Sequence, residues 1–181
     1  KEVYKNENYF VCIGRLTKQK NFSIVIDNYK KILQIDNDLK LYIIGEGEDY
    51  YLLKDKIYKN NLEKNIFLIG YRKNIFKYLQ NARFFLLSSL WEDPGWVLIE
   101  AAASNTSIIS SNCKNGPQEF IEKNLGGILF KNNDSESLLN AIKSFYNLSK
   151  EEILRKKIFS KRKSVFYTTF RHYKSLEKNI N

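Results

Sequence analysis

The chain has 181 residues, of which 43% are hydrophobic and 14% aromatic, and its net charge is +10. This length suits one domain with a sizeable core, and the hydrophobic content excludes an intrinsically disordered chain. No apolar run approaches the ~20 residues that a membrane-spanning helix needs, and the charged, Asn-rich opening residues lead us to expect no signal peptide. Methionine is absent even at position 1, so we expect a piece of a longer protein.

The cysteines and the charge narrow the class of protein further. Cys12 and Cys113 lie far apart and lack the spacing of metal ligands, so we interpret them as reduced thiols of a cytoplasmic protein. Cys12 falls within a predicted buried strand. The positive charge is compatible with nucleic acid, an anionic membrane surface or a ligand that carries a diphosphate. Composition alone does not choose between these partners.

Apolar runs alternate with amphipathic segments along most of the chain. Six strands are expected, at 9–13, 40–44, 65–69, 83–87, 106–110 and 127–130. Helices are expected between them, the first over 22–33 with Asn21 as its N-cap. After residue 134 only helices are predicted, at 135–148, 150–162 and 164–178. The sequence therefore predicts an α/β fold, a Rossmann-like parallel sheet flanked by helices, followed by an all-helical C-terminal segment.

The loop after the first strand runs from Gly14 to Asn21 and contains two cations, Arg15 and Lys20. A guanidinium is a bidentate fork and an ammonium is a point charge, and together they suit a diphosphate beside the start of a helix. Two solvated surface cations in a lysine-rich chain are the alternative interpretation.

Two later turns carry weaker signals. Gly45 and Gly47 follow the second strand, where either a tight turn or contact with a ligand explains a lone G-x-G. Tyr71 and Arg72 follow the third strand, and both have flat π surfaces that can stack on a nucleotide base. The alternative for this pair is a tyrosine at the edge of the core and a solvated arginine.

The stretch from Ser88 to Ile109, SSLWEDPGWVLIEAAASNTSII, has the pattern of strand, loop, helix and strand. Glu92 falls in the loop and Glu100 about two turns into the helix, so both carboxylates are expected to border one crevice at the carboxyl ends of the strands. The helix start offers unpaired N–H groups and the positive end of the helix dipole to an anion. The alternative interpretation is that Glu92 is an ordinary loop carboxylate and Glu100 a solvated helix residue, without a shared role.

The spacing of the two glutamates carries a resemblance to a known family. Seven residues separate Glu92 from Glu100, and two alanines follow. This resembles the E-x7-E motif of retaining nucleotide-sugar glycosyltransferases of family 4, which have the GT-B fold. The resemblance extends over about residues 9–175 and includes further segments: the G-R-x-x-x-x-K-N pattern at 14–21, the L-x-I-x-G-x-G pattern around Gly45, Gly116-Pro117-Gln118-Glu119, and the Gly-apolar strand at 126–130.

The resemblance implies one domain over residues 1–181, with the sheet at about 9–131 and the helices at about 135–178. This domain would be the donor-binding half of a GT-B enzyme whose N-terminal domain is absent. The resemblance assigns Arg15 and Lys20 to the donor diphosphate, Glu92 to hydroxyls of the donor sugar and Glu100 to the ribose. Arg15, Lys20 and Glu92 are accordingly the candidate catalytic residues. Further donor contacts are expected from Gly14, Tyr71, Arg72, Gly95, Trp96 and Val97.

The donor is expected to be a UDP- or GDP-sugar, with no metal and no other cofactor, because the chain's own cations can supply the positive charge. Many relatives have Gly-Phe-Gly where this chain has residues 93–96, Asp-Pro-Gly-Trp, so the identity of the sugar is open. The expected partners are the nucleotide-sugar donor and the missing N-terminal domain, and no nucleic acid. Without that domain, the fragment is expected to be inactive.

The Trp-Glu-Asp-Pro-Gly segment is most similar to enzymes that build bacterial surface polysaccharide or lipopolysaccharide. The alternative function is a basic α/β module that binds nucleic acid or another anionic polymer without catalysis. Basic and aromatic residues interleave between 156 and 170, which suits peripheral contact with the inner face of an anionic membrane. Simple packing of a terminal helix explains the same pattern. His172, the only histidine, is expected to have a surface or packing role.

Overall fold

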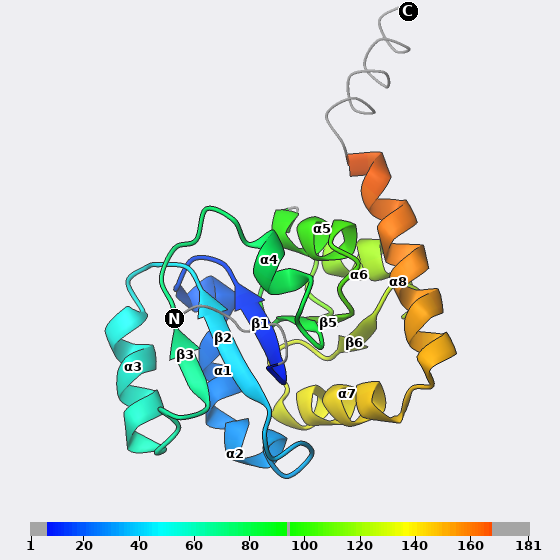
Figure 1. The fold of residues 1–181 in the computed structure, drawn as a ribbon. Helices are drawn as coiled ribbons and strands as arrows, with labels where there is room; N and C mark the ends of the chain where they lie inside the picture. Colours follow the sequence, from blue (N-terminus) through cyan, green and yellow to red (C-terminus); the bar gives the residue numbers. More distant parts are fainter. Residues whose placement is uncertain (1–6, 94, 168–181) are drawn as a thin grey trace, which may run out of the picture.

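The computed structural model describes residues 7–93 and 95–167. Six parallel strands form one sheet in the order β3-β2-β1-β4-β5-β6 (Figure 1). The strand order reverses between β1 and β4, which is the Rossmann topology and confirms the predicted fold class. The strands are β1 (Tyr9–Ile13), β2 (Lys40–Ile44), β3 (Ile66–Leu68), β4 (Phe85–Leu87), β5 (Ile108–Ser111) and β6 (Ile128–Phe130).

Helices connect the strands and complete the C-terminal segment. The α-helices are α1 (Phe22–Asp27), α2 (Tyr29–Ile32), α3 (Tyr50–Lys59), α4 (Phe76–Leu79), α5 (Trp96–Ala103), α6 (Pro117–Ile121), α7 (Ser135–Asn147) and α8 (Lys150–Ser164). Two short 3-10 helices, η1 (Lys18–Lys20) and η2 (Val165–Tyr167), accompany them.

The sheet is covered by helices on both faces. Side chains alternate along β1, so that Phe10 and Cys12 join the cluster formed with α1, α2, α3 and α7. Tyr9, Val11 and Ile13 join the opposite cluster, formed with α4, α5 and α6. Figure 1 shows the two groups of helices on opposite sides of the strands. Because both faces are buried, the strands read in the sequence as continuous apolar runs.

The first predicted helix is wrong in its continuity, although it begins where predicted. Asn28 separates α1 from α2, and its side-chain amide donates to the Ile24 carbonyl at 2.8 Å and to the Ser135 hydroxyl at 2.8 Å. Asparagine competes for backbone groups in this way, which interrupts the helix although the apolar spacing continues. Asn21 occupies the predicted N-cap position of α1 in a left-handed conformation with φ of 49°, but its side chain donates to Asn133 and makes no capping hydrogen bond.

The C-terminal helices follow the prediction as far as the described residues reach. Helix α8 begins at a capping box, in which Ser149 and Glu152 each accept from the other's backbone N–H. It packs against α5 and α6 and runs to Ser164, two residues beyond its predicted end. Most of the predicted helix over 164–178, and His172 with it, lies outside the described residues. Within the described ranges, no helix has the length and apolar character to cross a bilayer.

Candidate functional site

The loops after β1 and β4 meet at the carboxyl edge of the sheet, where the strand order reverses. Open α/β sheets bind ligands in the crevice at this point. Leu90 N–H donates to the Gln19 carbonyl at 2.8 Å, and the Gln19 side chain donates to the Trp91 carbonyl at 2.9 Å. These bonds hold the two loops side by side.

Lys20 and Glu92 form a buried ion pair between these loops. Lys20 Nζ lies 2.6 Å from Glu92 Oε1, and the two side chains are 13% and 4% exposed. The Ser89 hydroxyl donates to the same carboxylate oxygen at 2.5 Å. A buried charge needs a partner of this kind, since an unpaired one loses its hydration without compensation. The sequence predicted both residues in one site but not their direct contact.

Serine hydroxyls tie the surrounding loops together. The Ser88 hydroxyl donates to the Lys20 carbonyl at 2.7 Å, and the Ser111 hydroxyl at the end of β5 donates to the Ser89 carbonyl at 2.7 Å. Asn132, after β6, donates to the Leu90 carbonyl at 2.7 Å. None of these residues was predicted to have a role in the site. The detectable signal was a pair of serines closing a wholly apolar strand, where polar side chains need partners once buried.

A second part of the site is a cavity of about 300 Å³ at the ends of β1, β2 and β3. It brings together Gly14, Arg15, Tyr71 and Arg72, as the predicted sheet edge required. The Tyr71 ring is 67% exposed and free to meet a flat ligand. The remaining lining residues are Ile13, Ile44, Gly45, Glu46 and Ile75.

Hydrogen bonds hold Arg72 and Tyr71 at this cavity. Arg72 Nε donates to the Tyr78 hydroxyl at 3.2 Å, and its Nη1 donates to the Tyr71 carbonyl at 2.9 Å. Glu46 Oε1 accepts from the Tyr71 N–H at 3.3 Å. Arg72 is therefore anchored along the wall instead of being a solvated arginine. Glu46 was missed in the sequence because only its flanking glycines stood out there.

The glycines of the site are explained by close packing. A Cβ on Gly45 would lie 1.9 Å from the Gly14 carbonyl oxygen, so the backbones after β1 and β2 touch. This favours the structural interpretation of the G-x-G turn. A Cβ on Gly14 would lie 3.0 Å from Lys20 Cε, so the lysine stem needs the space that Gly14 leaves.

Helix α5 begins at Trp96, directly after Gly95, which adopts a left-handed conformation with φ of 81°. Trp96 is 58% exposed and Val97 is half-buried at this helix start. The prediction that Glu100 lies about two turns into the helix is wrong, because Glu100 is the fifth helical residue, just over one turn from the start. Its carboxyl is half-buried, and burial raises its pKa.

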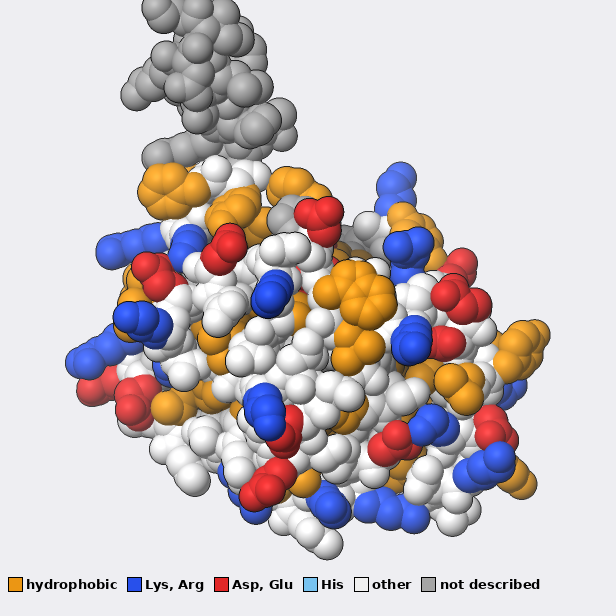
Figure 2. Space-filling view, turned by 180° about the vertical axis from the view of Figure 1, so that it is seen from behind, with side chains coloured by type: hydrophobic (Ala, Val, Ile, Leu, Met, Phe, Trp, Pro, Cys, Tyr) orange, Lys and Arg blue, Asp and Glu red, His pale blue; other side chains and the backbone are white. Residues whose placement is uncertain are grey.

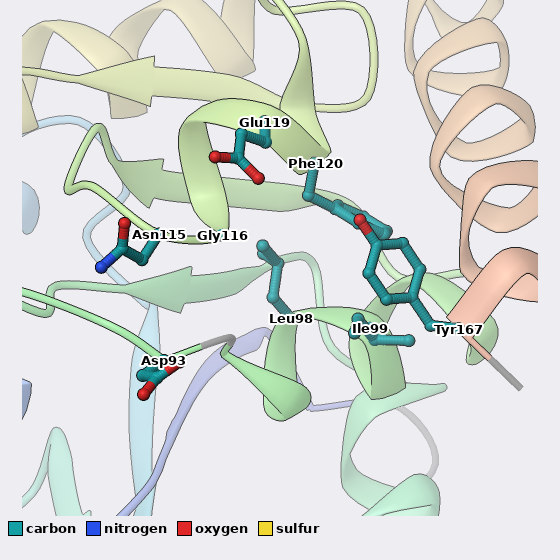
Figure 3. Close-up of a pocket in the computed structure, with 8 residues that line it drawn as sticks. All are labelled: Asp93, Leu98, Ile99, Asn115, Gly116, Glu119, Phe120 and Tyr167. Atoms are coloured by element: carbon teal, nitrogen blue, oxygen red, sulfur yellow. The ribbon is translucent and has the colours of Figure 1, made fainter. Parts of the chain in front are cut away.

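A smaller cavity of about 200 Å³ lies between the starts of α5 and α6. Figure 3 shows the polar side chains of Asp93, Asn115 and Glu119 around one end, and the rings of Phe120 and Tyr167 at the other. The two ring centroids are 5.7 Å apart. Two carboxylates make this cavity a poor place for a phosphate. Its polar residues were missed as site residues, although Gly116-Pro117 after a strand marked the turn that carries them.

Metal binding was expected to play no part in this site. Across residues 7–93 and 95–167, no three His, Cys, Asp or Glu side chains group together as metal ligands. Both cysteines are buried and unpaired by disulfide. Independence from metal stays a prediction, which a binding experiment has to test.

The topology and the location of the site define a Rossmann-type domain with its crevice at the switch point. Residues 1–164 match the glycosyl transferases group 1 family, and the chain belongs to this family. An uncharacterised glycosyltransferase of Methanocaldococcus jannaschii is 39% identical over 121 residues, which are 67% of this chain and 30% of that protein. The poly(ribitol-phosphate) alpha-N-acetylglucosaminyltransferase of Staphylococcus aureus is 29% identical over 98% of this chain and 36% of its own length.

Solved structures agree with this assignment. TarM of S. aureus, in a mutant form crystallised with UDP, has a TM-score of 0.84 at 26% identity, covering 97% of this chain and 35% of that chain. HepE of Anabaena in complex with UDP shares the fold, with a TM-score of 0.84 at 19% identity, over 97% of this chain and 49% of that one. The chain spans only about a third of the length of the two curated relatives described above.

Proposed function

We propose that this chain is the donor-binding half of a retaining family 4 glycosyltransferase that uses a nucleotide-diphospho-sugar. The observation that carries the proposal is the buried Lys20–Glu92 pair at the switch point, one loop away from the start of α5. A paired cation and carboxylate in one crevice suit a substrate that presents a diphosphate and sugar hydroxyls together.

The diphosphate is assigned to the cations and to the helix start. An ammonium has three N–H donors, so Lys20 can bond Glu92 and a phosphate oxygen at the same time. Arg15 is exposed at the cavity after β1 and can supply a bidentate contact. The N–H groups of Gly95, Trp96 and Val97 lie at the positive end of α5. Together these groups would stabilise the charge that develops on the leaving diphosphate as the sugar takes on oxocarbenium character.

The nucleoside is assigned to the cavity that Tyr71 and Arg72 border, with Glu100 as the acceptor of ribose hydroxyls and Glu92 as that of sugar hydroxyls. The UDP-bound relatives favour UDP over GDP as the nucleotide. Relatives named for poly(ribitol-phosphate) glycosylation and for amylovoran biosynthesis favour a role in bacterial surface polysaccharide synthesis. Trp96, exposed at the helix start, is the residue whose bulk would select the sugar.

Nucleotide titration tests the donor assignment. UDP, GDP and ADP are titrated into the chain with and without EDTA, and UDP is expected to bind without metal. Lys20→Ala should weaken UDP and 2′-deoxy-UDP alike, by about tenfold, because it removes a charge-assisted contact to phosphate. Lys18→Ala, an exposed lysine two residues away, is the matched control and should change neither affinity. Equal losses in both lysine variants would contradict the assignment.

Glu100→Gln separates a ribose ligand from a structural carboxylate. We expect about tenfold weaker UDP binding and a smaller preference for UDP over 2′-deoxy-UDP. Replacing a carboxylate that accepts hydrogen bonds from a vicinal diol loses about 1.4 kcal/mol or more of binding free energy. A variant that folds and weakens both nucleotides equally would exclude the ribose role.

The domain assignment has its own test. The chain alone should transfer no sugar from the matching donor to any acceptor, because the second GT-B domain would supply the acceptor contacts and close the crevice against water. Product detection by mass spectrometry after long incubation measures this. Turnover by the chain alone would mean that the active site is complete within these residues.

A further inference from the structure

Helix α8 has an inward and an outward face with different chemistry. On the inward face Ser160 and Ser164 are buried, and Lys156 and Lys163 donate to backbone carbonyls of the segment from Glu119 to Gly127. These two lysines therefore help to hold α8 against the rest of the fold. The outward face holds residues that the fold leaves in solvent.

The outward face combines apolar side chains with arginine. Leu154 is 54% exposed and Ile158 is 41% exposed, one helical turn apart. Arg155 and Arg162 are exposed on the same side, since residues three, four and seven apart share one face of a helix. A groove of about 590 Å³ lies between this face and the end of α6, and its lining combines Arg155, Ile158, Arg162 and Phe166 with Glu122, which pairs with Lys163 at 2.8 Å.

The charge of this segment is unbalanced. From Ile153 to Tyr167 the chain has six Lys and Arg and no Asp or Glu. Arg155, Lys161 and Arg162 form no salt bridge within the described residues. Figure 2 shows basic and hydrophobic side chains next to one another, with acidic side chains among them, along the edge of the molecule where α8 lies.

We propose that the outward face of α8 docks on an anionic lipid bilayer, parallel to its surface. Apolar side chains would enter the boundary between headgroups and acyl chains while the cations meet the lipid phosphates. Long basic side chains also suit this position because their stems are apolar and their charges reach water or headgroups.

Two other occupants fit the face less well. A second copy of the chain would place two unneutralised cationic faces against each other, and like charges across an interface are costly. A nucleic acid would meet the cations and could stack a base on Phe166, but it would leave Leu154 and Ile158 in water, because stacking on bases uses aromatic side chains. Exposed aliphatic residues gain most from an acyl environment.

Vesicle binding tests the proposal on the whole 181-residue chain. The chain is sedimented with vesicles of phosphatidylcholine alone and of phosphatidylcholine mixed with phosphatidylglycerol. We expect binding to the mixed vesicles only, weakening as salt is raised. Arg155→Glu/Arg162→Glu should lower the binding constant at least tenfold. Leu154→Gln/Ile158→Gln should lower it at least threefold without changing the net charge.

A charge-matched control separates this face from the general charge of the protein. Lys30→Glu/Lys64→Glu changes two exposed lysines outside α8 and should bind as the parent chain does. Equal losses in the control and in the arginine variant would overturn the proposal. So would RNA binding that the arginine variant abolishes while vesicle binding persists, or a dimer in light scattering that the same variant dissociates. Circular dichroism of each variant verifies that the helices remain folded.

Discussion

Lys20 and Glu92 should be strongly coupled in the stability of the fold. Lys20→Met leaves Glu92, 4% exposed, with the Ser89 hydroxyl as its remaining partner in the described structure, and should cost about 3 kcal/mol of unfolding free energy. Glu92→Gln leaves Lys20, 13% exposed and closer to water, and should cost about 1–2 kcal/mol. The double variant removes both charges and should cost about 2 kcal/mol, so the coupling energy is about 2–3 kcal/mol.

Urea denaturation of the four proteins at neutral pH measures this coupling. The i, i+4 pair of Asp55 and Lys59 is the control, because its side chains are 51% and 71% exposed and lie 2.7 Å apart. The double-mutant cycle of Lys59→Met and Asp55→Asn should give a coupling energy of no more than about 0.5 kcal/mol. If the buried pair couples no more strongly than this exposed pair, burial does not strengthen the interaction between Lys20 and Glu92, and the reasoning is refuted.

Four further outcomes are expected. Gly45→Ala should destabilise the fold by at least about 2 kcal/mol in urea, because its Cβ would lie 1.9 Å from the Gly14 carbonyl oxygen. Gly95→Ala meets only ordinary contacts and should cost about 1 kcal/mol for its left-handed conformation; a larger loss than at Gly45 would reverse the reasoning. Burial raises the pKa of Glu100, so its ionised form weakens the fold at neutral pH. Glu100→Gln should therefore stabilise the fold at pH 7, and this gain should shrink as the pH falls through the raised pKa and vanish by about pH 4; a gain that persists in acid would refute the burial argument. EDTA should change the affinity for UDP by less than about twofold, measured by calorimetry, whereas a large loss would indicate a metal-bridged diphosphate.

The sequence predicted the strands well because both faces of the sheet are buried. Most strands are apolar runs, with Ser110 and Ser111 at the end of β5 as the main exception, and β1 and β2 begin and end where the pattern predicted. The break at Asn28 was not predictable, since it depends on a hydrogen bond to Ser135, a residue 107 positions away. The helical spacing of apolar residues shows which side chains are buried. Because side chains on both sides of Asn28 are buried on the same face, the spacing does not reveal the interruption of the helix.

For the site, sequence reasoning located the loops but not their contacts. Parallel strands place their carboxyl ends at one edge, so Gly14, Arg15, Tyr71 and Arg72 were expected together and do line one cavity. The pairing of Lys20 with Glu92 spans 72 positions and depends on the rotamers of both side chains. The depth of Glu100 was misjudged because the start of a helix is set by the backbone of a glycine turn, which the apolar pattern does not show. The functions of these residues stay predictions.

The serine and asparagine bonds that join the loops after β1, β4, β5 and β6 have a consequence for the thermodynamics of ligand binding. A flexible loop loses conformational entropy when a ligand fixes it, at a cost of about 0.5–1.5 kcal/mol for each immobilised side chain. Here Lys20, Ser89 and Glu92 are already held by one another before any ligand arrives. Most of their ordering is completed during folding, so a nucleotide that enters the crevice meets a preorganised surface and retains more of its contact energy as affinity.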